Sequence, residues 1–163
     1  PAFRWGGATW SGNTVFIPQA LVEFLGFAPD ELANGMKIEA AWERVRKEYG
    51  RLGYLDAALD AKPVFDDAAA RVRFQVQVKE GAQYRMGQMV ITGLSLTAER
   101  MLLAAWRLPR GDVFSLLYFE DFVETQLRGR KAFGETVVNF KTVEHLLQPN
   151  PQTKTVDVLL NFD

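Results

Sequence analysis

Few residues in the chain are of types that carry chemistry, and they do not converge. His145 is the only histidine and cysteine is absent, so no second imidazole or thiolate is available to share a metal ion. Asp66 and Asp67 are adjacent carboxylates, and Glu39 and Glu43 lie one helical turn apart, but nothing near either pair completes an acid–base or metal-binding set. We therefore expect a solvated or packed imidazole, a turn and a solvated helix face at these positions.

Three short motifs also resemble functional signatures. Arg110-Gly111-Asp112 has the letters of an integrin-type attachment motif, but a glycine followed by an aspartate near a helix start is typical of a tight turn. Trp5-Gly6-Gly7 and Gly129-Arg130-Lys131 lack the remaining spacing of a phosphate-binding loop. The aromatic residues, including 12 phenylalanines, mostly follow the spacing of a hydrophobic core. The sequence therefore predicts neither an enzyme active site nor a bound cofactor or metal.

Composition and charge are typical of a globular protein that does not bind nucleic acid. Of the 163 residues, 48% are hydrophobic and 24% are charged, and 19 basic against 20 acidic side chains leave a net charge of −1. Proteins that bind nucleic acid usually carry a basic excess that neutralises phosphates. The longest apolar runs are shorter than the roughly 18 residues that span a bilayer. Because the sequence opens at Pro1 on strand-like residues, we interpret it as a segment of a longer protein.

An internal repeat organises the sequence. It appears when the first half is shifted by 81 residues, which places Arg4 under Arg85. The matched pairs include Phe3–Gly6 and Tyr84–Gly87, Gly12 and Gly93, and Leu21 and Leu102. Each half ends in an alternating apolar and polar segment, residues 71–79 and 154–162, which predicts a strand with one buried face. We therefore expect two structural units that meet near Glu80-Gly81-Ala82.

Each unit is predicted to contain a strand, two helices and two further strands. In the first unit we expect a strand over 2–10, helices over 18–25 and 38–52, and strands over 55–64 and 71–79. The longer helix follows from the spacing by four and three of Ile38, Trp42, Val45, Tyr49 and Leu52, which places them on one face. The segment 55–64 is rich in alanine, a composition that would also suit a helix.

The second unit repeats this order. We expect a strand over 83–92, a helix that Thr97 caps and that runs to Trp106, a helix that Ser115 caps and that includes Leu127, and strands over 136–146 and 154–162. The segment Gln148–Pro151 is predicted to break the chain between the last two strands.

The apolar positions also predict which residues form each core. They are Trp42, Val45, Tyr49, Phe74 and Val76 in the first unit, and Phe119, Val123, Val156 and Val158 in the second.

With this order of elements, the sequence resembles the POTRA domains, the periplasmic modules of BamA- and TamA-type outer-membrane assembly factors. Leu108–Ser115 is similar to the family's link between its two helices, and Leu52-Gly53-Tyr54 is similar to its step from the second helix to the second strand. Val76–Tyr84 resembles the junction at which one POTRA domain follows another. Two segments depart from the pattern: Gly26–Glu31, where a shorter link is usual, and Phe133-Gly134, where Gly-Tyr is expected.

The resemblance implies an α+β fold of two tandem POTRA-like βααββ units, residues 1–81 and 82–163. Each unit would have a three-stranded mixed sheet with two helices on one face. The resemblance further implies a non-catalytic, polypeptide-binding module of an outer-membrane β-barrel assembly or translocation protein, located in the periplasm. The implied partners are unfolded outer-membrane or secreted polypeptides, accessory assembly proteins and a C-terminal β-barrel of the same parent chain.

The expected binding feature is the main chain of an open sheet edge, to which an extended peptide can add as a further strand. We expect the alternating third strand at the centre of each sheet, which leaves the second strand with a free side. Pro63 fits an edge because it lacks an N–H, and Lys62 and Lys141 would discourage unwanted pairing. The candidate edge residues are Leu55, Ala57, Leu59, Ala61, Lys62, Val64, Val138, Phe140, Lys141 and Thr142.

Two other classes share part of this pattern. The POTRA region of a two-partner-secretion or cell-division protein would have the same fold but would act as a docking domain in another pathway. A KH-like nucleic-acid-binding module also combines two helices with three strands. That module needs a Gly-X-X-Gly loop together with a basic groove, a combination that the balanced charge of this sequence does not favour.

Overall fold

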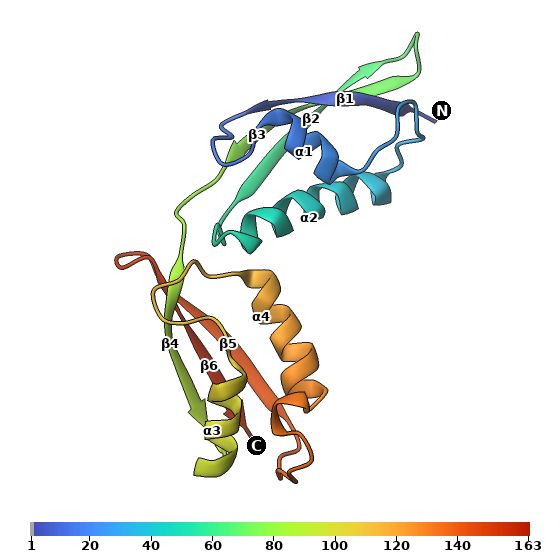
Figure 1. Cartoon of the computed structure of the whole chain (residues 1–163). Coiled ribbons are helices and arrows are strands. Elements are labelled where there is room, and N and C mark those ends of the chain that lie inside the picture. Colours follow the sequence, from blue (N-terminus) through green and yellow to red (C-terminus); the bar gives the residue numbers. More distant parts are fainter. Residues whose placement is uncertain (1) are drawn as a thin grey trace. The chain divides into compact units, whose positions relative to one another are not determined.

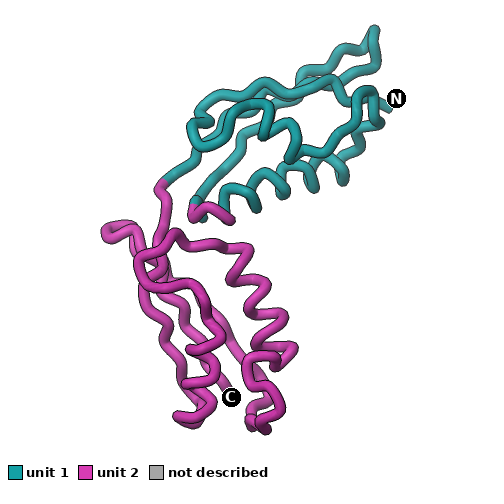
Figure 2. Tube along the Cα trace, in the orientation of Figure 1, with its two compact units in different colours: residues 1–50, 54–81 teal, residues 51–53, 82–163 magenta. Residues whose placement is uncertain are grey.

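The computed structural model describes residues 2–163. The chain divides into two structural units, which Figure 2 shows in different colours. The first unit comprises the chain up to Gly50 together with Tyr54–Gly81, and the second comprises Arg51–Gly53 together with Ala82–Asp163.

Both units have the order strand, helix, helix, strand, strand (Figure 1). The elements of the first unit are β1 (Arg4–Ser11), α1 (Pro18–Leu25), α2 (Gly35–Arg51), β2 (Ala58–Asp66) and β3 (Arg71–Lys79). Those of the second are β4 (Arg85–Thr92), α3 (Leu96–Ala105), α4 (Leu116–Phe122), β5 (Val143–Asn150) and β6 (Thr155–Phe162). A π-helical turn, Val123–Arg128, continues α4, and a 3₁₀ turn follows at Lys131–Phe133.

The third strand of each unit lies at the centre of its sheet, as predicted. The order is β1-β3-β2 in the first sheet and β4-β6-β5 in the second. The first strand runs parallel to the central strand and the second runs antiparallel to it. The alternation in β3 explains its place, because Val72, Phe74, Val76 and Val78 are buried while the residues between them are exposed. The chain therefore has the predicted α+β fold with two mixed three-stranded sheets.

The helices of each unit cover one face of its sheet (Figure 1). We call the opposite side the uncovered face. In the first unit, Trp42, Val45 and Tyr49 of α2 pack with Phe74 and Val76 of β3 in one buried cluster. The predicted residues of the second core, Phe119, Val123, Val156 and Val158, are also buried. Both core predictions are confirmed.

The 81-residue repeat extends to the hydrogen bonds that hold the loop between the two helices. The Trp5 N–H donates to the carbonyl of Glu31 at 2.8 Å, and the Met86 N–H donates to the carbonyl of Asp112 at 2.7 Å. In each unit an arginine at the start of the first strand also reaches the turn in this loop: Arg4 donates to the Asp30 carbonyl and Arg85 to the Gly111 carbonyl. Gly26–Glu31 therefore joins the first sheet through the same contacts as its counterpart in the second unit.

Gly111 occupies a left-handed turn with a φ of +93°. Asp30, its counterpart under the shift, has a φ of +62°. Glycine adopts this conformation without the steric cost that other residues meet. The prediction of a turn at Arg110-Gly111-Asp112 is confirmed.

Several predicted boundaries are wrong. Helix α3 begins at Leu96, and its cap is Ser95, whose hydroxyl accepts a hydrogen bond from the Ala98 N–H, not Thr97. The second strand of the first unit starts at Ala58, not at 55. The largest error concerns β5, which spans Val143–Asn150, not 136–146. Gln148, Pro149 and Asn150, predicted as a break, lie within this strand, and the turn is Pro151–Lys154.

Asn150 explains where β5 ends. Its side-chain oxygen accepts hydrogen bonds from the N–H groups of Gln152 and Thr153, at 3.0 and 3.2 Å. An asparagine that binds main-chain groups two and three residues ahead stabilises a turn. Pro149 remains in the strand, opposite Val156, because an edge strand tolerates a residue without an N–H.

Candidate functional site

β2 and β5 are the outer strands of their sheets on the side away from β1 and β4. Each pairs through one side only, β2 with β3 and β5 with β6. Within residues 2–163, neither strand has a main-chain hydrogen bond on its other side. A strand with this arrangement has unpaired N–H and C=O groups that can template a further strand.

The predicted edge residues of the first unit lie in or next to β2. Leu59 and Ala61 face the helices, opposite Val78 and Val76, and pack against the core. Lys62 and Val64 lie on the uncovered face, opposite Gln75 and Arg73. The two remaining residues, Leu55 and Ala57, precede the strand, Leu55 in a turn.

The predicted edge residues of the second unit, by contrast, lie in the loop before β5. Arg130 donates hydrogen bonds to the carbonyls of Val138 and Phe140, both at 2.9 Å. Its guanidinium group also stacks 3.9 Å from the centre of the Phe140 ring. The N–H groups of Lys141 and Thr142 both donate to the carbonyl of Asp163. These four residues are therefore not an open edge, and this part of the site prediction is wrong.

The physical reason is that Phe140 is half-buried and packs against two aromatic rings. Its ring lies 4.9 Å from that of Phe162 and 5.9 Å from that of Phe133. The open edge of the second unit is instead formed by Val143–Asn150. The length of the final strand offered a signal for it, because an antiparallel partner joined by a tight turn must end only a few residues before that strand begins.

A groove lies between β5 and the helical segment formed by α4 and the π-helical turn that continues it. It is about 280 Å³ in volume and is lined by Phe119, Glu120, Val123, Glu124, Arg128 and His145. The ring of His145 packs against that of Phe119, with 5.7 Å between the ring centres. Arg128 forms an ion pair with Glu124 one turn earlier. On the helix side, the edge of the second unit is thus bordered by the apolar side chains of Phe119 and Val123 and by carboxylates.

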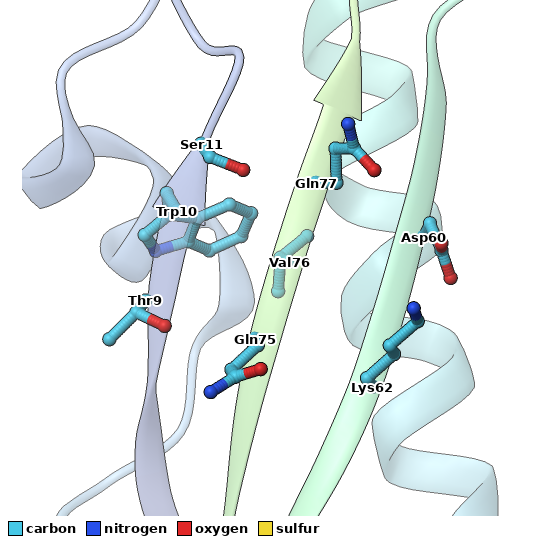
Figure 3. A pocket seen from close by; sticks show the side chains of 8 residues that line it. All are labelled: Thr9, Trp10, Ser11, Asp60, Lys62, Gln75, Val76 and Gln77. Atoms are coloured by element: carbon cyan, nitrogen blue, oxygen red, sulfur yellow. The ribbon is translucent and has the colours of Figure 1, made fainter.

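The uncovered face of the first sheet carries a shallow hollow of about 330 Å³ with a mostly polar lining (Figure 3). Thr9, Ser11, Asp60, Lys62, Gln75 and Gln77 line it. Trp10 and Val76, on the same strands, point through the sheet toward the helices (Figure 3). An arrangement of neutral and oppositely charged groups over a flat sheet offers hydrogen bonds but no enclosed reaction site.

Glu80 follows β3 and joins three segments of the first unit. Its carboxylate accepts hydrogen bonds from the N–H groups of Thr14 and Val15, at 3.0 and 2.9 Å, and from the Tyr49 hydroxyl at 2.7 Å. The Thr14 hydroxyl donates to it as well. Burial by itself raises the pKa of Glu80, but these hydrogen bonds hold that pKa below its ordinary value. Burial, followed by the bond to Glu80, raises the pKa of Tyr49.

No group of three or more histidine, cysteine, aspartate or glutamate side chains among residues 2–163 is arranged to hold a metal ion. Likewise, none of the helices in the described part of the chain is both long and apolar enough to cross a membrane. The features that stand out for binding are the open strands β2 and β5 and the surfaces that border them.

Comparison with known proteins gives the family of the first unit. Residues 3–81 match the family model of POTRA, the surface antigen variable number repeat. The first unit is a POTRA domain. The second unit has the same topology and strand directions as this POTRA domain.

Two solved structures show the same fold over 99% of the chain. Haemophilus influenzae BamA POTRA3-5 has a TM-score of 0.70 at 21% identity, and the chain covers 61% of that structure. BamA from Haemophilus ducreyi lacking POTRA domains 1-3 has a TM-score of 0.75 at 18% identity, with 29% of that structure covered. The chain thus has the fold of two tandem POTRA units.

A curated relative from Treponema pallidum (strain Nichols) is 24% identical over 161 residues and is described as a "putative outer membrane protein assembly factor". The match covers 99% of this chain but only 18% of that protein. The chain therefore spans less than a fifth of the length of this relative.

Proposed function

We propose that this chain is the POTRA segment of an outer-membrane assembly factor and that it binds unfolded polypeptides by β-strand addition. The observation that carries this proposal is the pair of outer strands, β2 and β5, whose main chains are unpaired on one side. A bound segment would lie in extended form beside one of them and would exchange main-chain hydrogen bonds with it. The descriptions of the similar proteins support the assembly role.

Main-chain recognition suits a protein that must handle many unrelated sequences. N–H and C=O groups are common to every polypeptide, so affinity would come from the backbone, and neighbouring side chains would add preference. The shallow hollow beside β2 and the groove beside β5 are compatible with this mode, because an added strand needs an open neighbour. Binding of this kind is expected to be weak, since ordering a disordered chain costs free energy.

The proposal includes a location and partners. The segment would act in the periplasm, without catalysis, on unfolded outer-membrane or secreted polypeptides, next to accessory assembly proteins and a β-barrel of the same parent chain. Residues 1–81 and 82–163 are proposed as its two domains. The chain's net charge of −1 gives no support to a nucleic-acid partner.

A titration of the isotope-labelled chain with an unfolded segment of an outer-membrane barrel protein tests the proposal. We expect amide NMR shifts to concentrate in β2, β5 or both, and to saturate with the segment's concentration. The exposed residues Glu43 and Lys47 of α2 provide an internal control, because a strand added to an edge does not reach that surface. Shifts confined to helix residues such as these, with both edges unchanged, would contradict strand addition.

A further inference from the structure

The two sheets have equivalent positions on their uncovered faces but different chemistry. Side chains of neighbouring strands that lie opposite one another form rows across the sheet. In the first unit the rows are polar: Thr9, Gln75 and Lys62 form one, and Ser11, Gln77 and Asp60 the next. In the second unit the row equivalent to the first of these is apolar and consists of Val90, Leu159 and Leu146.

The edge residue of each row shows the difference most clearly. Lys62 and Leu146 occupy the same place, opposite Gln75 in β3 and Leu159 in β6. A lysine on an outer strand opposes pairing with another chain, because its charge would have to be desolvated. Leu146, by contrast, is 59% exposed, and Val90 at the other end of its row is 42% exposed. In this row the first edge therefore carries a charged side chain and the second an apolar one.

The positions of the prolines in the two edge strands support the same difference. Pro63 lies within β2, with three residues of the strand after it, so the run of N–H groups on that edge is interrupted. Pro149 is the last residue but one of β5. Val143–Gln148 therefore offers an uninterrupted stretch of main chain for an added strand.

The carboxylates beside β5 indicate which charge a bound segment should carry. Glu144 lies on the uncovered face two residues before Leu146, opposite Asn161. Glu120 lines the groove on the helix side. Neither carboxylate forms an ion pair within residues 2–163, whereas Glu124 is matched by Arg128. A basic side chain in an added strand would gain a partner at either position, and an acidic one would be repelled.

We propose that β5 is the principal capture edge and that it takes extended polypeptide segments in which two adjacent apolar residues stand near a basic one. Because successive side chains of a strand point to opposite faces, one apolar residue extends the row Val90–Leu159–Leu146. The next residue lies over Phe119 and Val123 in the groove. The basic residue pairs with Glu144 or Glu120. This inference rests on the proposed strand addition and names the edge and the substrate class that it favours.

A reciprocal exchange of the two edge residues tests it. The probe is an eight-residue peptide, the length of β5, with a central Lys-Thr-Val-Phe-Lys segment. Both lysines share a face with Val, so one of them lies opposite Glu144 in either direction of the added strand. With the unchanged chain we expect amide shifts in Val143–Gln148. Leu146→Lys should weaken binding by about fivefold or more. The variant loses the cross-strand pair with the apolar residue of the peptide and the apolar contact that this pair buries. Lys62→Leu should create new shifts in β2.

Two controls separate the chemistry from the fold. Met36→Lys places the same charge on an exposed apolar position of α2, outside both edge strands, and should bind as the unchanged chain does. A peptide with Ser-Ser in place of Val-Phe should lose most of its affinity. Both edge positions are exposed, so the exchanged variants should keep the amide spectrum of the folded chain.

The possible results distinguish this inference from the function on which it rests. Shifts in β5 with an affinity that Leu146→Lys leaves unchanged would overturn the inference while leaving strand addition intact. A preference of the peptide for β2 in the unchanged chain would do the same. If neither this peptide nor the longer unfolded segment shifts any residue of β2 or β5, both proposals are wrong.

Discussion

At the scale of single residues, the hydrogen bonds that the Glu80 carboxylate accepts make the stability of the first unit depend on pH. The folded-state pKa of Glu80 is lowered from its ordinary value of 4.5. The stabilising contribution of the carboxylate is therefore complete above that value, and it is lost as the pH falls below 4.5 through the folded-state pKa. The segments that this carboxylate joins are the loop with Thr14 and Val15, helix α2 and the end of β3.

Glu80→Gln tests this coupling. The variant should have a lower melting temperature at neutral pH, because an amide is a weaker acceptor for the N–H and hydroxyl donors than a carboxylate is. It should also lose less stability than the unchanged chain between neutral pH and pH values below 4.5. Thermal melts across this range measure both effects, with Glu39→Gln on the exposed side of α2 as the matched control. Parallel pH curves for Glu80→Gln and the unchanged chain would exclude the assigned role.

Trp42 is the residue that we expect to contribute most to the first core. It is 5% exposed, and its ring contacts those of Trp5, Trp10 and Phe74 at centre distances of 6.4, 6.2 and 5.3 Å. Trp42→Ala should lower the free energy of unfolding by about 3–5 kcal/mol, since it removes apolar contact and leaves a cavity. Met36→Ala in the same helix, at 86% exposure, should change it little. Similar urea midpoints for the two variants would contradict this core.

At the scale of elements, two glycines end the first strand of each unit at equivalent positions. Gly12 and Gly93 have φ values of +82° and +90°, and a Cβ at either would collide with the carbonyl of the central strand, at Val78 and Phe162 respectively. Both close approach and left-handed backbone therefore require glycine here.

Gly93→Ala is expected to destabilise the second unit by at least about 1–2 kcal/mol, the cost of a left-handed conformation for an L-residue. Gly35→Ala is the control, because Gly35 is the first residue of α2 and a Cβ there meets nothing within 4 Å. Urea denaturation followed through the amide signals of β6 measures the effect. An unchanged midpoint for Gly93→Ala would show that the strand end adapts and that the glycine is not required.

The elements differ in how well sequence alone predicts them. β3 was predicted at its observed bounds because its alternation leaves one buried face in a single register. The predicted helix 18–25 also matches α1 at both ends, and its first residue, Pro18, suits a first helical turn. The segment before β5 misled the prediction because Val138 and Phe140 alternate as a strand would, whereas Arg130 and two aromatic rings hold them in a loop. Contacts of this kind are tertiary, and no local pattern encodes them.

The candidate site residues could be predicted from the sequence only where the bounds of their strands were predicted closely. β2 was identified with a small error in its start, so Lys62 and Val64 were placed on the correct edge. His145 and Leu146 lay at the end of the predicted strand 136–146 but were not among the candidate residues, because that strand was placed too early in the sequence. The apolar row across the second sheet depends on the register of three strands, which a single sequence does not supply.

At the scale of the whole molecule, one repeat has produced two units with the same topology and different edges. The first edge carries a lysine beside a polar face, and the second carries a leucine beside an apolar row and a groove. Duplication of a binding module followed by such divergence would let a chain contact different parts of an unfolded substrate. We expect the second unit to set the preference for apolar sequence, and the first to contribute mainly main-chain contact.

The central claim is that recognition runs through the main chain, and backbone methylation of the bound peptide tests it most directly. In an added strand, the N–H groups of alternate residues point toward the edge. A series of eight-residue peptides, each the length of β5 and N-methylated at one position, should therefore alternate in affinity. Methylation at every second position should weaken binding by about two- to tenfold, the loss of a main-chain hydrogen bond, and methylation at the positions between should have little effect. Equal affinities throughout the series, or losses that follow side-chain type without alternation, would contradict the claim.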